Sequence, residues 1–286
     1  MRIAYGVHGY SRGHATRASA VLTSLCERHE VRIYAGGDAY DFLSRKFPVE
    51  RIPSLGFSYN QNGKMSKLKT FLNNFPKALD LFRHGPQFRQ LLGSMRSFGP
   101  DVVISDAEAW THRAALALGI PRIGFDHFGV MVYCRVPLAL MDRLRSTMDR
   151  RLYLGFIGTP DRVLVSSFYD VPPNDETVQV IGPLLRDEVH HVQPRDGDHL
   201  LVYLNNGVRQ MNRRLEGILQ SLSREVRLYG AGRVGREGQI DYRPPGNLSF
   251  LRDLATCKAV LSTAGNQLVG EAIHYGKPLL VMPERT

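Results

Sequence analysis

The sequence predicts an α/β protein with two domains, whose parallel sheets face a central cleft. Short apolar segments bounded by Gly, Pro or Asp alternate with segments of helical spacing. This alternation stops at a polar stretch rich in Pro and Gly and then starts again. The chain has 286 residues, enough for two domains of ordinary size. Strand–helix–strand alternation implies parallel strands that helices cover on both faces.

The first series of apolar segments forms the N-terminal domain, which we expect over residues 1–183. The expected strands are 2–7, 30–36, 101–106, 121–126 and 162–167. Between the first two, Ala18, Val21, Leu22 and Leu25 recur at helical spacing. Residues 184–197 are polar, contain Pro and Gly, and are predicted to be the linker.

The second series forms a C-terminal domain, which we expect over residues 198–286. The expected strands are 199–207, 225–232, 247–251, 258–265 and 278–283, and the expected helices are 208–222 and 266–276. The last strand has no helix after it to cover the sheet, so we expect this domain to be incomplete. In open α/β sheets, ligands bind outside the carboxyl ends of the strands.

Composition limits the classes of protein to consider. A hydrophobic fraction of 43% with 22% charged residues is typical of a soluble globular protein. Three cysteines without metal spacing indicate a reducing, cytoplasmic setting. The N-terminus does not read as a signal peptide, and no apolar run approaches the roughly 20 residues that span a bilayer. The net charge of +10 favours an anionic partner, although it also serves solubility.

The segment LSTAGNQLVGEAIHYGKPLLVMPE, residues 261–284, carries the most chemical information. It reads as strand, small-residue turn, helix, glycine stop and strand. Thr263, Ala264 and Gly265 leave room for a ligand near the backbone, and the amides of Gly265, Asn266 and Gln267 would donate to a diphosphate at the helix start. Glu271, one turn on, is placed to accept from ribose hydroxyls. An ordinary strand–turn–helix unit would explain the same residues.

This segment resembles the nucleotide-sugar signature of GT-B glycosyltransferases. It is most similar to the MurG-type bacterial N-acetylglucosaminyltransferases (glycosyltransferase family 28), which complete the lipid-linked peptidoglycan precursor. The matching residues are Thr263, Gly265, Glu271, Gly276, Pro278 and Pro283. The resemblance implies a GT-B fold of two Rossmann-like domains, a UDP-sugar donor held by the second domain, and no metal or other cofactor.

The same resemblance extends to two further segments of the second half. Asn205, Asn206 and Gly207 in YLNNG would supply hydrogen bonds to the diphosphate. Phe250 and Leu251 in LSFL fall where the family places the residues that contact the uracil base. The asparagines are equally suited to cap a helix, and core packing is the alternative for Phe250 and Leu251.

The segment GYSRGHATR, residues 9–17, resembles the family's glycine-rich turn on the acceptor side, with Gly9, Gly13, His14 and Arg17 in place. An imidazole that titrates near neutrality can remove a proton from an attacking hydroxyl. His14 is therefore predicted to be the general base, or else to contact the donor phosphates. Arg12 and Arg17, beside Gly13, would neutralise phosphate charge. A turn or capping histidine is the alternative without function.

Asp106 and Glu108, in PDVVISDAEAW, follow a buried strand at the same expected edge. A subgroup of these transferases has a similar Asp-x-Glu sequence, so either carboxylate would serve as the base, orient His14 or bind acceptor hydroxyls. Capping of the next helix is the alternative for Asp106. Asp126 and His127 end the neighbouring strand. The implied reaction is an inverting displacement in which a hydroxyl attacks a hexose, N-acetylglucosamine being one candidate, and UDP leaves.

Two basic segments suggest contact with an anionic surface. Between Phe57 and Gly99 the only acid is Asp80. The same stretch contains basic residues interleaved with Phe and Leu, namely Lys64, Lys67, Lys69, Lys77, Arg83, Arg89 and Arg96. Further on, Met141, Leu144, Met148 and Leu152 form a stripe beside arginines. Basic amphipathic helices favour a peripheral membrane contact or a lipid-linked acceptor, and ordinary solvated helices have the same composition. No nucleic-acid-binding motif appears, so nucleic acid is not an expected partner.

Two other functions fit the same sequence. A UDP-sugar 2-epimerase would share the fold, need further carboxylates in the cleft and form product without an acceptor. A non-catalytic protein would keep the nucleotide pocket, or only the basic surface, without chemistry.

Overall fold

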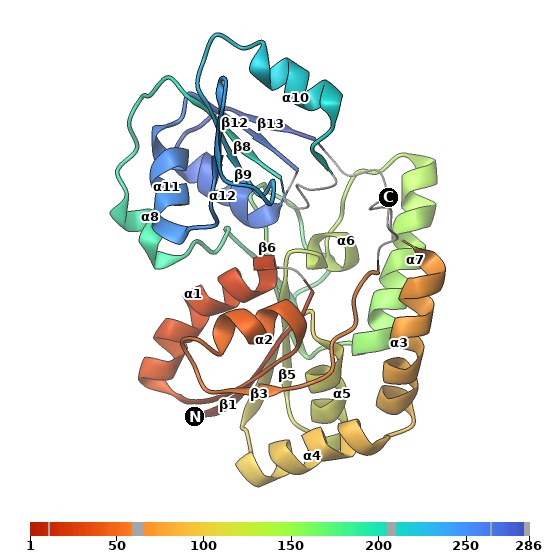
Figure 1. Ribbon diagram of the computed structural model, residues 1–286. Helices are drawn as coiled ribbons and strands as arrows, with labels where there is room; N and C mark the ends of the chain where they lie inside the picture. The colour runs from red at the N-terminus through yellow and green to blue at the C-terminus, as the bar shows by residue number, and fades with distance from the viewer. Residues whose placement is uncertain (11, 59–65, 205–209, 264, 283–286) are drawn as a thin grey trace. The chain divides into compact units, whose positions relative to one another are not determined.

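The computed structural model describes residues 1–10, 12–58, 66–204, 210–263 and 265–282, and it divides the chain into two compact units (Figure 1). Unit 1 comprises the described residues up to Leu184, and unit 2 comprises those from Leu185. The expected N-terminal domain and linker meet within one residue of this division. Each unit has its own sheet and its own buried core.

Unit 1 contains a seven-stranded sheet in the order β3-β2-β1-β4-β5-β6-β7, and all of its strand pairs are parallel. Its strands are β1 (Arg2–Val7), β2 (Glu30–Ala35), β3 (Val49–Arg51), β4 (Val102–Asp106), β5 (Arg122–Asp126), β6 (Arg162–Ser166) and β7 (Val178–Ile181). The five strands expected from the sequence are all present, and β3 and β7 add the two edges. Val7 pairs with Ala35 on one side and Asp106 on the other, so three strands end together at one edge.

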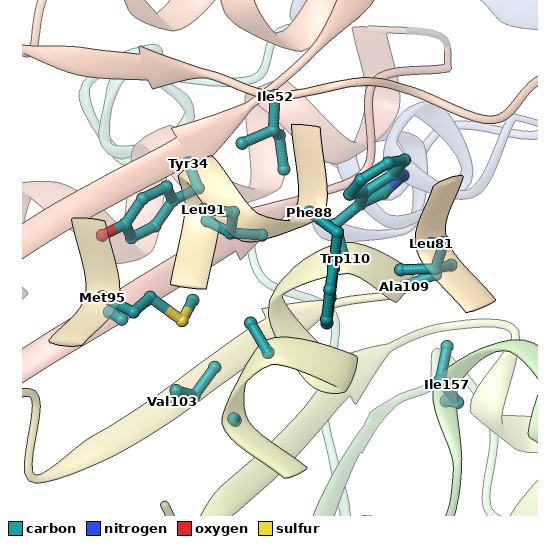
Figure 2. Close-up of a cluster of buried hydrophobic side chains, with 13 residues drawn as sticks. Tyr34, Ile52, Leu81, Phe88, Leu91, Met95, Val103, Ala109, Trp110 and Ile157 are labelled. Carbon is teal, nitrogen blue, oxygen red and sulfur yellow. The ribbon is translucent and has the colours of Figure 1, made fainter. Parts of the chain in front are cut away.

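Helices cover both faces of this sheet. They are α1 (Arg12–Arg28), α2 (Gly37–Leu43), α3 (Lys67–Phe82), α4 (Pro86–Phe98), α5 (Ala109–Leu118), α6 (Gly129–Tyr133) and α7 (Leu140–Ile157). α1 and α2 pack on one face. α4 and α5 pack on the other, where Trp110 and Phe88 are fully buried (Figure 2). Gly6 permits this close packing of α5, because a Cβ there would lie 2.0 Å from Thr111 Oγ1.

Unit 2 contains a six-stranded sheet in the order β10-β11-β9-β8-β12-β13. Its strands are β8 (Leu200–Tyr203), β9 (Val226–Tyr229), β10 (Gly235–Glu237), β11 (Ile240–Arg243), β12 (Ala259–Ser262) and β13 (Leu279–Val281), and its helices are α8 (Asp187–His191), α10 (Arg213–Gln220), α11 (Asn247–Thr256) and α12 (Asn266–His274). Five strands run parallel: the expected β8, β9, β12 and β13, together with β11, which the sequence analysis did not anticipate. β10 is antiparallel to β11 and forms an edge hairpin that the sequence analysis did not anticipate.

One expected strand is wrong: residues 247–251 begin helix α11. Its buried residues include Phe250, Leu251, Leu254 and Ala255, which recur at the spacing of one helix face. The strand interpretation stopped at Leu251 and missed the second half of this pattern. Within the expected linker, α8 packs on unit 2 through Val189, which is fully buried. None of the described helices is long and apolar enough to cross a bilayer.

Candidate functional site

In unit 1, the predicted site residues gather at the carboxyl edge of the sheet. α1 begins shortly after β1, with Arg12 and Gly13 in its first turn and His14 following. The segment between β1 and α1 is held close to the start of α2, because the carbonyl of Gly9 accepts from the backbone amide of Asp38 at 2.9 Å. A Cβ on Gly9 would lie 2.5 Å from the carbonyl oxygen of Gly36. The backbone amide of His8 donates to the carbonyl of Asp106 at 3.1 Å, which holds the start of the same turn at the end of β4.

Asp106 is the centre of this arrangement. Its side chain is fully buried and its Oδ1 lies 2.8 Å from Nδ1 of His14. Arg17 donates from Nε to Oδ2 at 3.0 Å and from its terminal nitrogen to Oδ1. A carboxylate only accepts hydrogen bonds, so the contact with Asp106 requires a proton on Nδ1 of His14; in the neutral ring Nε2 then keeps a lone pair. With 24% of its side chain exposed, His14 is also accessible to a ligand.

The charges around His14 favour this tautomer. Burial alone would raise the pKa of Asp106, but Arg17 and His14 together hold that pKa below its ordinary value. Asp106 is therefore ionised at neutral pH. The ring of His8 lies 5.1 Å from that of His14, and burial lowers the pKa of His8 to about 3, which keeps it neutral. His14 thus lies beside one buried anion, Asp106, and one buried cation, Arg17, whose terminal nitrogen is 3.1 Å from Nδ1 of His14.

Glu108 has a different role from Asp106. Its carboxylate accepts from the backbone amides of Trp110 at 2.8 Å and Thr111 at 2.7 Å, so it caps the start of α5. The helix cap that the sequence offered for Asp106 therefore falls on Glu108. Ala107 between them has φ of 51°, and this turn sends the two carboxylates to different partners. Burial raises the pKa of Glu108 to about 7.

The neighbouring strand end carries a further buried acid. Asp126 accepts from the hydroxyl of Tyr153 in α7 and from the amide of Gly129. Burial raises the pKa of Asp126. His127 beside it places Nδ1 2.7 Å from the carbonyl oxygen of Ser166. Tyr153 joins α7 to the edge where His14 and Asp106 lie, a link that no sequence motif indicated.

In unit 2, Glu271 lies in α12 and is 1% exposed. Arg186 donates two hydrogen bonds to the Glu271 carboxylate, from Nε to Oε1 at 2.8 Å and from a terminal nitrogen to Oε2 at 2.9 Å. Gln267 donates to Oε1 at 3.2 Å. Asn247 accepts from the third nitrogen of Arg186. The sequence analysis missed Arg186, which it placed in the linker; the only signal for it is that a buried carboxylate requires a cation.

The start of α12 has space beside it. Gly265 is the N-cap residue, with no side-chain cap, and a Cβ added there would meet none of the described residues within 4 Å. Asn266 Oδ1 is buried and has no hydrogen-bond partner among the described residues. Thr263 directly follows β12. A helix start with space in front of it suits an anion.

The remaining predicted donor residues divide into two groups. Asn205, Asn206, Gly207 and Ala264 lie outside the described residues. Phe250 and Leu251 belong to the core of unit 2, Leu251 with no exposed surface and Phe250 with 8%. This placement fits the core-packing alternative, above all for Leu251. Within the described residues, no group of three or more His, Cys, Asp and Glu side chains is arranged to hold a metal ion.

Two Rossmann-like units define the GT-B fold, and the chain is a glycosyltransferase of this fold. It belongs to glycosyl transferase family 1, whose family model matches residues 1–286. This match does not single out the MurG-type group suggested by the motif in the second half.

Individual relatives are distant. The uncharacterized glycosyltransferase MK0977 of Methanopyrus kandleri is 25% identical over 270 residues, which cover 86% of this chain and 75% of the relative. The Streptomyces sp. SF2575 glycosyltransferase SsfS6, solved with thymidine diphosphate, has a TM-score of 0.60 at 18% identity, covering 100% of this chain and 82% of the other. Arabidopsis thaliana UGT89C1, solved with UDP-L-rhamnose, has a TM-score of 0.61 at 14% identity, covering 100% and 79%. These structures confirm the expected fold.

Proposed function

We propose that the protein transfers a hexose from a UDP-sugar to a hydroxyl acceptor by a single inverting displacement, with His14 as the general base. The observation that carries this proposal is the 2.8 Å contact between Nδ1 of His14 and the buried Asp106. It leaves Nε2 free of a proton on a ring that a ligand can reach. The hydroxyl gives its proton to Nε2 as its oxygen bonds to the anomeric carbon, and the bond to UDP breaks.

Asp106 acts in this scheme as a positioning residue. It fixes the tautomer of His14 and stabilises the imidazolium that forms when the proton arrives. Arg17 keeps Asp106 ionised through its two contacts. Because Arg17 is buried and bonded to Asp106, it is less suited to bind donor phosphates than the sequence suggested. Glu108 supports the same edge by capping α5 and takes no proton from the acceptor.

Unit 2 supplies the donor site in this proposal. The amides at the start of α12, with Gly265 before them, bind the diphosphate and stabilise the charge of the leaving group. Arg186 orients Glu271 and adds positive charge. Glu271 is buried and bonded to Arg186 and Gln267, so it accepts from ribose hydroxyls only by exchanging one of these contacts. SsfS6 was solved with thymidine diphosphate and UGT89C1 with UDP-L-rhamnose, which supports a nucleoside diphosphate. The second-half motif favours uridine, with N-acetylhexosamines among the sugars to be tried.

The acceptor in this proposal is a hydroxyl compound on a lipid carrier, reached at the cytoplasmic face of a membrane. The basic helices of unit 1 support this choice. The chemistry needs no metal, because the amides at the start of α12 and the Arg186 guanidinium stabilise the negative charge of the departing diphosphate.

A pair of substitutions tests the assignment of roles. Thermal shift with a panel of nucleotide-sugars first identifies the donor. With that donor and an acceptor, His14→Ala is expected to lower kcat by about 10²–10⁴-fold and to leave UDP affinity in calorimetry unchanged. Glu271→Gln is expected to weaken UDP binding. Equal losses of turnover and UDP affinity in His14→Ala would reassign His14 to the donor phosphates.

His29→Ala is the matched control for the His14 substitution. His29 follows α1 at its other end, away from the carboxyl edge of the sheet. Its removal should change neither kcat nor UDP affinity. If no nucleoside diphosphate shows saturable binding to the wild-type protein, the proposed function is wrong.

A further inference from the structure

Helix α3 attaches to unit 1 through polar side chains. Thr70 Oγ1 accepts from the amide of Ser58 at 2.9 Å, and Asn74 bonds both the amide and the carbonyl of Gly56, at 3.2 and 2.8 Å. Lys77 donates to the carbonyl of Ser54 at 2.7 Å. Only Leu81, in the last turn, is fully buried. The polar face of this helix is therefore the one that faces the protein.

The apolar face of α3 is exposed as a result. Its exposed apolar side chains are Leu68, Phe71, Leu72, Phe75, Leu79 and Phe82, of which Leu68 is 67% exposed and Phe71 59%. A surface helix of a globular protein normally has the opposite arrangement, with its apolar stripe toward the core. Contact of so many large apolar groups with water is unfavourable, so this surface indicates a partner.

Helix α7 repeats the arrangement on the same side of unit 1 (Figure 1). The last turns of the two helices meet, with the rings of Phe82 and Phe156 5.4 Å apart. From residue 140 to residue 152 every residue of α7 except Ser146 is exposed. The apolar ones are Leu140, Met141, Leu144, Met148 and Leu152, at intervals of one helical turn, and Met148 is 75% exposed.

Positive charge accompanies both apolar stripes. On α3, Lys67 and Lys69 are exposed, whereas Lys77 and Asp80 are bonded to the rest of unit 1. α7 carries Arg143, Arg145, Arg150 and Arg151 against Asp142 and Asp149. Apolar side chains flanked by lysine and arginine match the two layers of an anionic membrane surface, in which acyl chains lie beneath negative headgroups.

We propose that the exposed faces of α3 and α7 dock unit 1 on a phospholipid bilayer that contains anionic lipids. A second copy of the chain fits less well. A two-fold dimer brings the same patch of each subunit together, and here that would place lysine and arginine against one another. The apolar residues enter the acyl region, and the basic residues remain at the headgroups.

The docking surface is connected to the proposed active site. Tyr153 follows Leu152 in α7, and its hydroxyl donates to Asp126 at the carboxyl edge of the sheet. An acceptor held in the bilayer would thus arrive beside the edge that carries His14; this consequence alone rests on the proposed function. Membrane docking itself requires neither donor nor acceptor.

Cosedimentation with vesicles tests the docking. The full chain is mixed with vesicles of phosphatidylcholine alone, or of phosphatidylcholine and phosphatidylglycerol in equal parts. We expect binding to the anionic vesicles that weakens with added salt. The variants Phe71→Glu/Phe75→Glu and Leu144→Glu/Met148→Glu should each reduce the partition coefficient at least about tenfold, since each removes two inserted apolar groups and adds negative charge.

Leu116→Glu is the matched control, because Leu116 is 51% exposed on α5, outside both stripes. It should bind vesicles like the wild type. All replaced side chains are exposed, so circular dichroism and the UDP thermal shift should be unchanged, which separates docking from the proposed function. Absence of binding to anionic vesicles, or equal weakening by Leu116→Glu, would overturn the proposal. So would a dimer in light scattering that Phe71→Glu/Phe75→Glu dissociates.

Discussion

Asp106 shows how single residues create chemistry at this sheet edge. A buried carboxylate is costly unless it is paired, and Asp106 has two partners, Arg17 and His14. Arg17 balances the negative charge of Asp106. Asp106 therefore stays ionised and orients His14. Glu108, two residues on, lacks a cationic partner among the described residues, and burial sets its pKa near 7. Two carboxylates of similar burial thus differ because their neighbours differ.

The raised pKa of Glu108 predicts a specific dependence of stability on pH. An unfolded glutamate titrates near 4.5 and the folded one near 7, so the folded state binds more protons between these values. The contribution of Glu108 to stability is therefore full below about pH 4.5 and is lost as pH rises to 7. Relative to Glu108→Gln, the free energy of unfolding of the wild type should fall by about 2–3 kcal/mol between pH 5 and 8.

Urea unfolding of both proteins at several pH values measures this difference. Subtracting the curve of Glu108→Gln removes the titration of all other groups that the substitution does not touch. Parallel curves for the two proteins across this range would mean that the folded Glu108 titrates near its ordinary value.

The sequence singled out His14, Asp106 and Glu271 as candidates and offered orientation of His14 by Asp106 or Glu108 as one alternative, but it did not indicate that Arg17 contacts Asp106 or that Arg186 contacts Glu271. Chemistry-bearing residues at strand ends and helix starts can be predicted because those places recur in α/β sheets. Their pairing depends on side-chain directions, which spacing does not determine. His14 and Asp106 are far apart in the chain, and Arg186 stands in a segment without a motif. Glu108 was offered for catalysis, yet the turn at Ala107 directs it to α5.

At the scale of elements, the strands of both units were predictable because a buried parallel strand is a short apolar run with turn residues at its ends. Residues 247–251 fit that description too, and only Leu254 and Ala255 distinguish the helix that actually forms. β3, β7 and β10 are edge strands, and β3 and β10 have only three residues each, so their signal is weak. β11 lies inside the sheet between β10 and β9, and the sequence analysis missed it although Ile240 and Tyr242 are buried.

Gly6 tests the packing of α5 on β1. In Gly6→Ala the new Cβ would lie 2.0 Å from Thr111 Oγ1, so α5 has to move or Thr111 has to change rotamer. We expect a loss of about 1–3 kcal/mol in the free energy of unfolding. Because α5 begins near Asp106, the shift should also lower turnover. Thermal and urea unfolding measure the first effect.

Gly93→Ala provides the control for this substitution. Gly93 lies inside α4, and a Cβ there meets no atom of the described part of the chain within 4 Å. Alanine should therefore stabilise the helix by about 0.5–1 kcal/mol. Similar effects of the two substitutions would show that Gly6 is not needed for the close approach of α5.

At the scale of the whole molecule, the two units carry different parts of the proposed reaction. Unit 1 contains the candidate base and the apolar surfaces, and unit 2 contains the candidate diphosphate site. Because each unit has its own core, a ligand that binds one of them should stabilise that unit more than the other. Hydrogen exchange resolves the two responses along the chain.

Addition of UDP should therefore slow amide exchange chiefly in unit 2, around α8, α11 and α12, where Arg186, Asn247 and Glu271 form one network. At a UDP concentration of about 100 times Kd, the stabilisation should reach about 2.7 kcal/mol for amides that exchange by unfolding of that unit. Arg186→Gln should remove most of this protection, because it frees Glu271 from its orientation and deletes a positive charge. His14→Ala should leave it intact. Protection confined to unit 1 would instead place the nucleotide against the glycine turn of α1 and contradict a donor site at α12.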